Sequence, residues 1–304
     1  MTSIRAWLVR RSLPALRMTV QPERRSVRAM RAGMEGFLSR FPKPPKFHEA
    51  PFSLTNLSGR MIHVKPSIPH RVGILFFHGG GYAMGSSRTH RYLAARLSER
   101  LGVPVFLPDY RLAPEHPFPA AVEDAVLAWQ QIPAAYPHLT HWLIGGDSAG
   151  GGLALALLQE IRRLGLCSPI GTFLFSPWAD LYSGHAAHKK LEKKDPYLDV
   201  PIIRSWGIQY AGEHIGHPLA SVIGGTYTQA GPIFLQVGTH EILYHDACLM
   251  RDVLEKTAGV ELQFSAWKGM FHGFQMCEGL FPEAGKALDE FAVWARQVIQ
   301  KSVS

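Results

Sequence analysis

The chain of 304 residues contains only three cysteines, at positions 167, 248 and 277, far apart in the sequence. No CxxC pair occurs, and an odd number of cysteines cannot pair completely within one chain. These counts argue against a disulfide framework and against a cysteine metal site. We therefore interpret the three residues as small buried hydrophobic side chains in a reducing compartment.

The sequence also lacks an uninterrupted apolar stretch of the roughly 20 residues that a membrane-spanning helix needs. Near the N-terminus, arginines at positions 5, 10, 11 and 17 interrupt every apolar run, so the hydrophobic region of a signal peptide is missing. With 46% hydrophobic residues, the chain can bury a large core in one domain, or in one domain with a small addition. We expect a soluble, cytoplasmic protein.

Acidic residues are scarce at the N-terminus, where Glu23 and Glu35 are the only ones among the first 46 residues. The basic residues there explain the net charge of +8: Arg5, Arg10, Arg11, Arg17, Arg24, Arg25, Arg28, Arg31, Arg40, Lys43 and Lys46. We interpret them as the solvated face of an N-terminal helical segment. The alternative is a basic helix that touches a lipid surface. Nucleic acid is not expected as a partner, because no recognised binding module accompanies the charge.

After position 50 the signals of strands and helices alternate. A hairpin is expected over 51–66, with its turn near Ser58 and Gly59. Short apolar runs predict strands at 73–77, 103–110, 141–146, 171–177, 232–238 and 260–267. Helical patterns lie between and after them, at 87–100, 117–131, 149–164, 243–258 and 281–301. This alternation predicts an α/β fold with a mostly parallel sheet and helices on both faces.

Two stretches interrupt the pattern and suggest how the chain is divided. The prolines of FPKPPKF (41–47) end the helical signal of the first 40 residues, and residues 180–225 form an insertion between two strands. We divide the chain into an N-terminal helical cap segment (1–45), a catalytic core (46–179 and 226–304) and a cap insertion (180–225). Because sites in open parallel sheets lie beyond the carboxyl ends of the strands, the insertion can form a roof over the site.

The strongest motif is Gly146-Asp147-Ser148-Ala149-Gly150, a G-x-S-x-G sequence between a predicted strand and a predicted helix. This context is the one that a nucleophile elbow requires. Glycines at both ends leave room for a strained turn, so that Ser148 projects its hydroxyl above the sheet. The following helix places free N–H groups and its positive end beside the reacting centre. We therefore predict Ser148 as a nucleophile.

A second glycine-rich motif, His78-Gly79-Gly80-Gly81, follows the predicted strand 73–77. Uncovered backbone amides of this kind can donate hydrogen bonds to a tetrahedral oxyanion, and HGGG is the oxyanion-hole pattern of lipases and esterases. A phosphate-binding P-loop is disfavoured, because no Lys-Ser or Lys-Thr pair ends the motif. We assign His78 a structural role in holding this loop.

Five blocks together resemble the bacterial hormone-sensitive-lipase-like esterases: HGGGYAMGS (78–86), DYRLAPEHPFPAAVEDA (109–125), GDSAGG (146–151), SPWADL (176–181) and GMFHGF (269–274). The match runs from about residue 70 to 300 in the family's order. It implies an α/β-hydrolase fold with an eight-stranded core, a helical cap and hydrolysis of short acyl esters. It also implies an oxyanion hole formed by Gly80, Gly81 and Ala149 with Gly79 as support, and it is compatible with a homodimer.

The chain order Ser, acid, His of this fold places the histidine late. His272 follows the strand 260–267 and matches the family's histidine block, so we predict it as the general base. Glu241, three residues past the strand 232–238, is the predicted acid that orients it. The family more often has Asp there, and Asp246 is the alternative. We assign surface roles to the histidines of the insertion, His185, His188, His214 and His217.

Several other polar and aromatic residues receive structural interpretations. Asp109 and Arg111 are expected to form a buried ion pair that supports the loops, and Asp147 a structural contact beside the nucleophile. Four aromatic residues either line an acyl or alcohol pocket or pack in the core or cap: Trp178, Tyr182, Trp206 and Tyr210.

The chemistry predicted is that of a serine carboxylester hydrolase with a Ser-His-Glu triad, which needs no metal and no cofactor. A small-molecule ester is the expected substrate. The alternative class is a ligand-binding protein on the same scaffold, and the presence of His272 favours the enzyme. The same triad also cleaves amides and lactones, so the sequence leaves the physiological substrate open.

Overall fold

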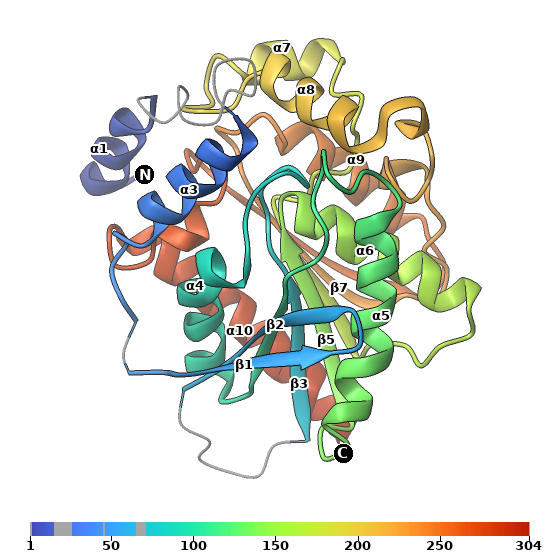
Figure 1. The fold of residues 1–304 in the computed structure, drawn as a ribbon. Coiled ribbons are helices and arrows are strands. Elements are labelled where there is room, and N and C mark those ends of the chain that lie inside the picture. The colour runs from blue at the N-terminus through green and yellow to red at the C-terminus, as the bar shows by residue number, and fades with distance from the viewer. Residues whose placement is uncertain (1, 15–25, 45, 65–70, 304) are drawn as a thin grey trace.

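The computed structural model describes residues 2–14, 26–44, 46–64 and 71–303 (Figure 1). Its centre is one eight-stranded sheet with the strand order β1-β2-β4-β3-β5-β6-β7-β8. The strands are β1 (His48–Leu54), β2 (Leu57–His63), β3 (Val72–Phe77), β4 (Val105–Pro108), β5 (His141–Asp147), β6 (Gly171–Phe175), β7 (Gly231–Gly238) and β8 (Val260–Trp267). The neighbouring pairs from β4 to β8 are all parallel, whereas the pairs β1–β2 and β2–β4 are antiparallel. The predicted mostly parallel, eight-stranded sheet is confirmed.

Helices follow the strands as the alternation predicts, and further helices lie before and between them. They are α1 (Ile4–Ser12), α3 (Val27–Leu38), α4 (Ser87–Leu101), α5 (Ala120–Ala135), α6 (Ala149–Arg163), α7 (Ala186–Leu191), α8 (Val200–Ala211), α9 (Tyr244–Glu255) and α10 (Pro282–Val303). Short 3₁₀ turns lie at Gly212–His214, Val222–Gly224 and Phe274–Cys277.

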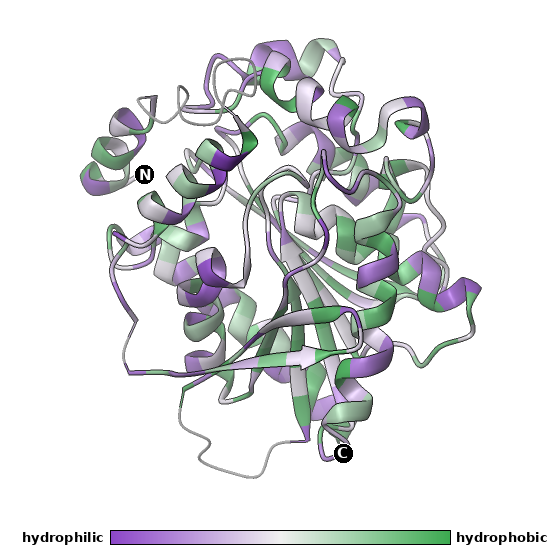
Figure 2. Cartoon of the chain, in the orientation of Figure 1, coloured by the Kyte–Doolittle hydropathy of each residue, from purple (hydrophilic) through white to green (hydrophobic). Residues whose placement is uncertain are grey.

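The side chains of β3 show how the sheet divides the core. All six residues of this strand are buried, and successive side chains of a strand point to opposite faces. Leu75 and Phe77 belong to the cluster that includes the buried faces of α5 and α6. Ile74 and Phe76 belong to the cluster that includes α4 and α10. The continuous apolar run of β3 is therefore the signature of a strand covered by helices on both faces, and the sheet is correspondingly apolar in Figure 2.

The hairpin of β1 and β2 turns earlier than the sequence suggested. Leu54 pairs with Leu57, so the two turn residues are Thr55 and Asn56, not the pair Ser58-Gly59. Asn56 has a positive φ of 56°, a conformation that asparagine tolerates better than most residues. Gly59 lies within β2, where a Cβ atom would overlap the backbone of the neighbouring β4. The glycine serves close packing of strands rather than the turn.

Four helices lie beyond the carboxyl ends of the parallel strands, at the top of the molecule in Figure 1: α1 and α3 before the sheet, and α7 and α8 between β6 and β7. The helical character predicted for the first 40 residues is confirmed for α1 and α3. The predicted basic residues Arg17, Arg24 and Arg25 lie outside the described residues. The division into core and cap remains our proposal.

The cysteines do not share one environment. Cys277 is buried, Cys248 is half-buried and Cys167 is exposed. The prediction of three buried side chains is therefore wrong for Cys167, which lies in the loop after α6. Within the described residues, no helix has the length and apolar character needed to cross a membrane.

Candidate active site

Ser148 lies at the tight connection between β5 and α6. Its backbone angles, φ 54° and ψ −123°, are unusual for a residue with a side chain and store strain. Cβ atoms at Gly146 or Gly150 would overlap backbone atoms of the neighbouring segments. The two glycines of the G-x-S-x-G motif therefore make the turn sterically feasible. The Ser148 hydroxyl makes no hydrogen bond within the described residues, so it is available to a substrate.

The glycine loop after β3 lies beside Ser148. The Gly79 amide donates a hydrogen bond of 2.9 Å to Oδ1 of Asp147, which commits this donor to holding the loop. Gly80 and Gly81 have positive φ values of 125° and 62°, and their amides make no hydrogen bond in the described part of the chain. Ala149 is the first residue of α6, where a helix has no internal partner for its amide. The amides of Gly80, Gly81 and Ala149 are therefore available to an oxyanion. Asp147 has the predicted structural role, because it holds the glycine loop through the Gly79 amide.

His78 fixes this loop from within. Its Nδ1 atom lies 2.9 Å from the carbonyl oxygen of Gly79, to which only a protonated ring nitrogen can donate. The ring stacks on Tyr110 at a centroid distance of 4.2 Å, and the Tyr110 hydroxyl donates to the His78 carbonyl oxygen at 2.7 Å. Burial, aided by the nearby His90, lowers the pKa of His78 to about 4. His78 is therefore a neutral structural residue.

His272 and Glu241 come together from the loops that follow β8 and β7. Nδ1 of His272 lies 3.3 Å from Oε1 of Glu241. The other carboxylate oxygen, Oε2, accepts hydrogen bonds from Oγ of Ser176 at 2.9 Å and from the Gly238 amide at 3.2 Å. Glu241 is fully buried, and both of its oxygens are engaged. Its orientation is fixed, which is the arrangement that holds an imidazole in one tautomer.

The electrostatic surroundings of His272 favour its protonated form. Burial alone would lower its pKa. The hydrogen bond and the charge of Glu241, with the charges of Asp195 and Asp147, outweigh burial and raise the pKa of His272 above its ordinary value of 6.5. A base that accepts a proton during a reaction needs this stabilisation of its charged form.

Asp246, the alternative acid, has other partners. Its Oδ1 atom lies 2.7 Å from Nε2 of His188, and Oδ2 accepts hydrogen bonds from the amides of Ala179 and Asp180 at 3.1 and 3.0 Å. His188 is fully buried, so the predicted surface role is wrong for this histidine. The reason is that α7 turns it inward onto α9, where Asp246 compensates its polarity. Asp246 links the insertion to the core, and among the described residues it makes no hydrogen bond or salt bridge to His272.

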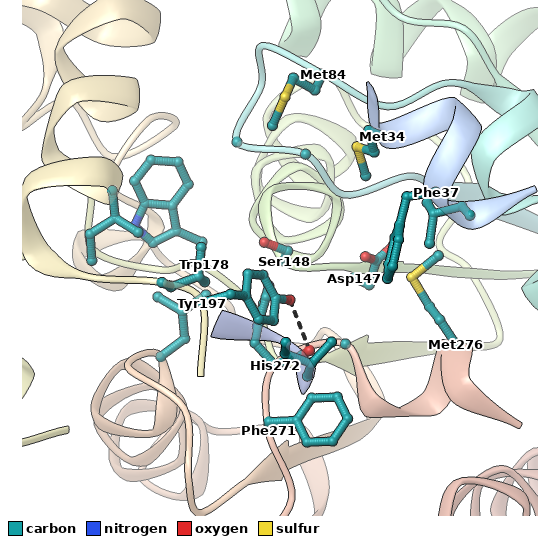
Figure 3. A pocket seen from close by; sticks show the side chains of 18 of the residues that line it. Met34, Phe37, Met84, Asp147, Ser148, Trp178, Tyr197, Phe271, His272 and Met276 are labelled. Atoms are coloured by element: carbon teal, nitrogen blue, oxygen red, sulfur yellow. Dashed lines mark hydrogen bonds between the residues drawn. The ribbon is translucent and has the colours of Figure 1, made fainter. Parts of the chain in front are cut away.

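Ser148 and His272 line one pocket, a cavity of about 140 Å³. Figure 3 shows their side chains around a common space, with Trp178 and Tyr197 on one side and residues of α3 on the other. No hydrogen bond among the described residues joins the Ser148 hydroxyl to the imidazole; such bonds often form only when substrate is bound. The walls are largely apolar and include Met34, Phe37, Leu38, Phe41, Met84, Trp178, Ile203, Trp206, Leu243, Phe271 and Met276.

Comparisons with known proteins identify the fold family. A model of the alpha/beta hydrolase fold family matches residues 74–276. The chain belongs to this alpha/beta hydrolase family. An acetyl-hydrolase from Streptomyces hygroscopicus is 37% identical over 234 residues, which cover 77% of this chain and 78% of that protein. An esterase from Acinetobacter venetianus is 32% identical over 269 residues, 88% of each chain.

A crystal structure of an esterase from the bacterial hormone-sensitive lipase family superimposes on the hydrolase with a TM-score of 0.91. The sequences are 28% identical, and the superposition covers 98% of this chain and 100% of that chain. The resemblance to the hormone-sensitive-lipase-like esterases is confirmed, and so is the α/β-hydrolase fold.

The hydrolase has two supporting residues that the sequence did not reveal. Oδ2 of Asp195, in the insertion, accepts a hydrogen bond of 2.9 Å from the amide of Ile242, next to Glu241. The Tyr197 hydroxyl donates at 2.9 Å to the carbonyl oxygen of His272, the dashed line in Figure 3. The insertion thus holds both the acid loop and the histidine loop. Burial raises the pKa of Asp195 to about 6. In the sequence, only the acidic residue and the turn-forming proline of Asp195-Pro196-Tyr197 could have suggested that this segment supports the two loops.

The remaining predicted residues have mixed outcomes. Trp178 and Trp206 line the pocket, whereas Tyr182 is exposed. Tyr210 of the insertion stacks on Tyr82 of the glycine loop, at 3.8 Å between ring centroids. Trp206 also lies where a Cβ atom on Gly81 would be, so the insertion packs directly on the glycine loop of the hydrolase.

The predicted ion pair between Asp109 and Arg111 is wrong. Asp109 accepts hydrogen bonds from the backbone and side chain of Ser87, at 2.6 and 2.9 Å. Arg111 is paired with Asp124 and Glu123 of α5. Both residues lie in the loop after β4, which ends at Pro108, so their side chains follow the loop, and Asp109 meets the start of α4 while Arg111 meets α5.

Proposed function

We propose that this carboxylester hydrolase cleaves short-chain acyl esters through an acyl-enzyme on Ser148. The observation that carries the proposal is the fully buried Glu241 bonded to His272, which lines the same pocket as Ser148. An imidazole oriented by a carboxylate and facing a strained serine is the arrangement of a general base and its nucleophile.

In the first half-reaction His272 takes the hydroxyl proton of Ser148 on Nε2 while the serine oxygen attacks the ester carbonyl carbon. The negative charge that develops on the carbonyl oxygen faces the amides of Gly80, Gly81 and Ala149. Their donors are fixed before the reaction, which is what lowers the barrier. The tetrahedral intermediate collapses, the bond to the alkoxy group breaks, and His272 returns the proton to the leaving alcohol.

In the second half-reaction water takes the place of the alcohol. His272 accepts a proton from the water as its oxygen attacks the acyl carbon, and the same amides hold the oxyanion. Collapse breaks the bond to Ser148, which recovers its proton, and the carboxylic acid leaves. Glu241 keeps its charge throughout and stabilises the imidazolium that forms in both halves.

The preference for a short acyl group rests on the size of the pocket. A cavity of about 140 Å³ is close to the ~150 Å³ that holds a benzene molecule in an apolar protein cavity. An acetyl or butyryl group fits within such a space, whereas a sixteen-carbon chain would have to extend beyond it. The name acetyl-hydrolase of the Streptomyces relative points in the same direction. A homodimer and a cytoplasmic location remain predictions from the sequence.

The test compares p-nitrophenyl butyrate with p-nitrophenyl hexadecanoate, using Ser148→Ala as the control. We expect rapid release of nitrophenol from the butyrate, far slower release from the hexadecanoate, and loss of both in the variant. Equal rates on both esters would overturn the chain-length preference alone. Full activity of Ser148→Ala would overturn the acyl-enzyme.

A further inference from the structure

The outer face of α1 exposes three large apolar side chains. Ile4, Trp7 and Leu8 are 78%, 41% and 55% exposed. Their spacing of three and four residues places them on the same side of the helix. Isolated exposed hydrophobic residues are ordinary on proteins, but an apolar group of this kind marks a surface that contacts something else.

This exposure is a fixed property of the helix, because its inner face is anchored to the core. Ala6 and Leu13 are 1% and 5% exposed and pack in a cluster with Phe271 and Phe281. At the start of the helix, the Ser3 hydroxyl donates a hydrogen bond of 2.8 Å to Glu283 of α10. With its inner face occupied, α1 cannot rotate to bury Trp7 or its apolar neighbours.

Basic residues surround this apolar group. Arg5 and Arg11 are exposed, and the guanidinium of Arg11 lies over the Trp7 ring at 4.5 Å from its centroid. Neither arginine forms a salt bridge within the described residues. Figure 2 accordingly shows α1 with hydrophobic and hydrophilic residues mixed along its visible surface.

A second group of cations comes from the insertion. Lys189, Lys190, Lys193 and Lys194 are exposed, and none is paired among the residues described. Helix α7, which carries the first two, lies at the same end of the molecule as α1 (Figure 1). The pKa of His240 is lowered by its burial and by the charges of both Arg10 and Lys194, so the two basic segments approach one another there. We call the outer face of α1 and these four lysines the basic cap face.

The basic cap face adjoins the pocket. Leu13, just after the last turn of α1, and Tyr197, three residues after Lys194, both line the cavity that contains Ser148. Any surface that covered the exposed side chains of α1 would therefore lie close to the cavity.

We propose that the basic cap face docks the protein on an anionic phospholipid bilayer. Ile4, Leu8 and the indole of Trp7 enter the boundary between headgroups and acyl chains, where amphipathic aromatic rings are favoured. The arginines and lysines face the lipid phosphates, and their attraction adds to the apolar contribution. A nucleic acid would satisfy the cations but would offer no apolar partner for Ile4 and Leu8, so the bilayer accounts for both features.

The experiment is flotation of the full chain with vesicles of phosphatidylcholine alone or with about one third phosphatidylglycerol. We expect binding to the anionic vesicles, weak binding to the neutral ones, and release at high salt. The apolar variant combines Ile4→Ser, Trp7→Ser and Leu8→Ser, and the charge variant changes the four lysines to Gln. Each should weaken partition onto anionic vesicles by about tenfold or more.

Matched control variants distinguish binding through the basic cap face from non-specific binding by other exposed apolar or basic residues. Val293→Ser removes an apolar side chain that is 54% exposed on α10, and Lys256→Gln removes an exposed cation after α9; both should bind like the unmodified protein. Hydrolysis of p-nitrophenyl butyrate in solution should be unchanged in all variants, which shows that they fold and keeps this test separate from that of the proposed function. Failure of the unmodified protein to float overturns the proposal, as does undiminished binding by the apolar and charge variants. Binding to single-stranded RNA but not to vesicles would also overturn it.

Discussion

Two buried pairs of a carboxylate and a histidine lie on either side of the start of α9. Glu241 and Asp246 are five residues apart, both fully buried, and each is paired with a histidine from a distant segment. The Glu241–His272 contact is 3.3 Å long, whereas the Asp246–His188 contact is 2.7 Å. By burial and by distance, the second pair is the tighter contact. Neither criterion therefore identifies a catalytic acid.

The two pairs differ in what lies beyond the histidine. His272 lines the cavity that contains Ser148, while His188 packs against the rings of His185 and His245. Oδ2 of Asp246 holds the amides of the chain after β6, which makes this pair a joint between insertion and core. In the proposed mechanism, a buried histidine–carboxylate pair serves catalysis only where the histidine faces the serine; the same pairing elsewhere stabilises the fold.

Replacing each histidine by alanine should separate the two roles most strongly. We expect His272→Ala to lower kcat for p-nitrophenyl butyrate by about 10⁴-fold, as removal of a triad base does elsewhere. His188→Ala should keep kcat within a few-fold and lower the melting temperature instead. Steady-state kinetics and thermal unfolding of both variants check this. A catalytic defect of His188→Ala as large as that of His272→Ala would remove the distinction.

The carboxylates should follow the same division with a smaller kinetic effect. Glu241→Ala should reduce kcat by roughly 10³-fold, less than loss of the base, because the imidazole and the oxyanion amides remain. Asp246→Ala leaves His188 and two amides buried without a partner, so we expect it to reduce the free energy of unfolding by about 3 kcal/mol. Denaturant titration and kinetics below the melting range measure the two effects. If Asp246→Ala proves the more damaging to kcat, our assignment of the acid is wrong.

The pH dependence of the reaction reports on His272. In the proposed mechanism its neutral form is the base. Its pKa is raised by Glu241 despite burial, so kcat/KM should fall as pH decreases through a value above 6.5. In Glu241→Gln the charge is lost, and this acid limb should move to lower pH. The stability contribution has the opposite sign: it is complete below the pKa of histidine in the unfolded chain and is lost as pH rises through the raised pKa. Rate profiles and melting curves over the same pH range should therefore slope in opposite directions.

Tyr197→Phe is expected to have the smallest of these effects. It removes one hydrogen bond to the carbonyl oxygen of His272 and no group that touches the ester, which should lower kcat about threefold to tenfold with little change in KM. Asp195→Asn disturbs the Ile242 amide on the other loop and should act in the same direction. Variants at Tyr182, which is exposed on the same insertion, provide the matched control and should retain full activity.

The parts of the fold and site that depend on local rules were predictable from the sequence. The strand 260–267 and the turn at Ser148 follow from apolar patterning and from glycines that leave room for a strained backbone. The order of serine, acid and histidine in this fold then predicted that Glu241 and His272 follow the carboxyl ends of β7 and β8. These features depend only on neighbouring residues in the sequence or on the order of motifs that the fold requires.

Features that depend on which distant segments meet were not predictable. The sequence pairs Asp109 with Arg111, but the loop after β4 brings them to different helices, α4 and α5. His188 has the polar, lysine-rich neighbours of a surface residue, and only the packing of α7 on α9 buries it. The contact of Asp195 with Ile242 joins residues 47 positions apart. Which charged side chains pair depends on which segments pack together in the folded chain, and a single sequence does not reveal this.

The backbone of Ser148 has a consequence for how such a protein can change over time. Its positive φ and extended ψ are conformations that glycine adopts without strain, whereas a serine there costs about 1–3 kcal/mol. Ser148→Gly should therefore melt at a higher temperature than the active protein, although it cannot form an acyl-enzyme. Selection for thermal stability alone would therefore favour glycine over the proposed nucleophile. In the proposed mechanism, the strained backbone at position 148 is thus a stability cost that only the reaction requires.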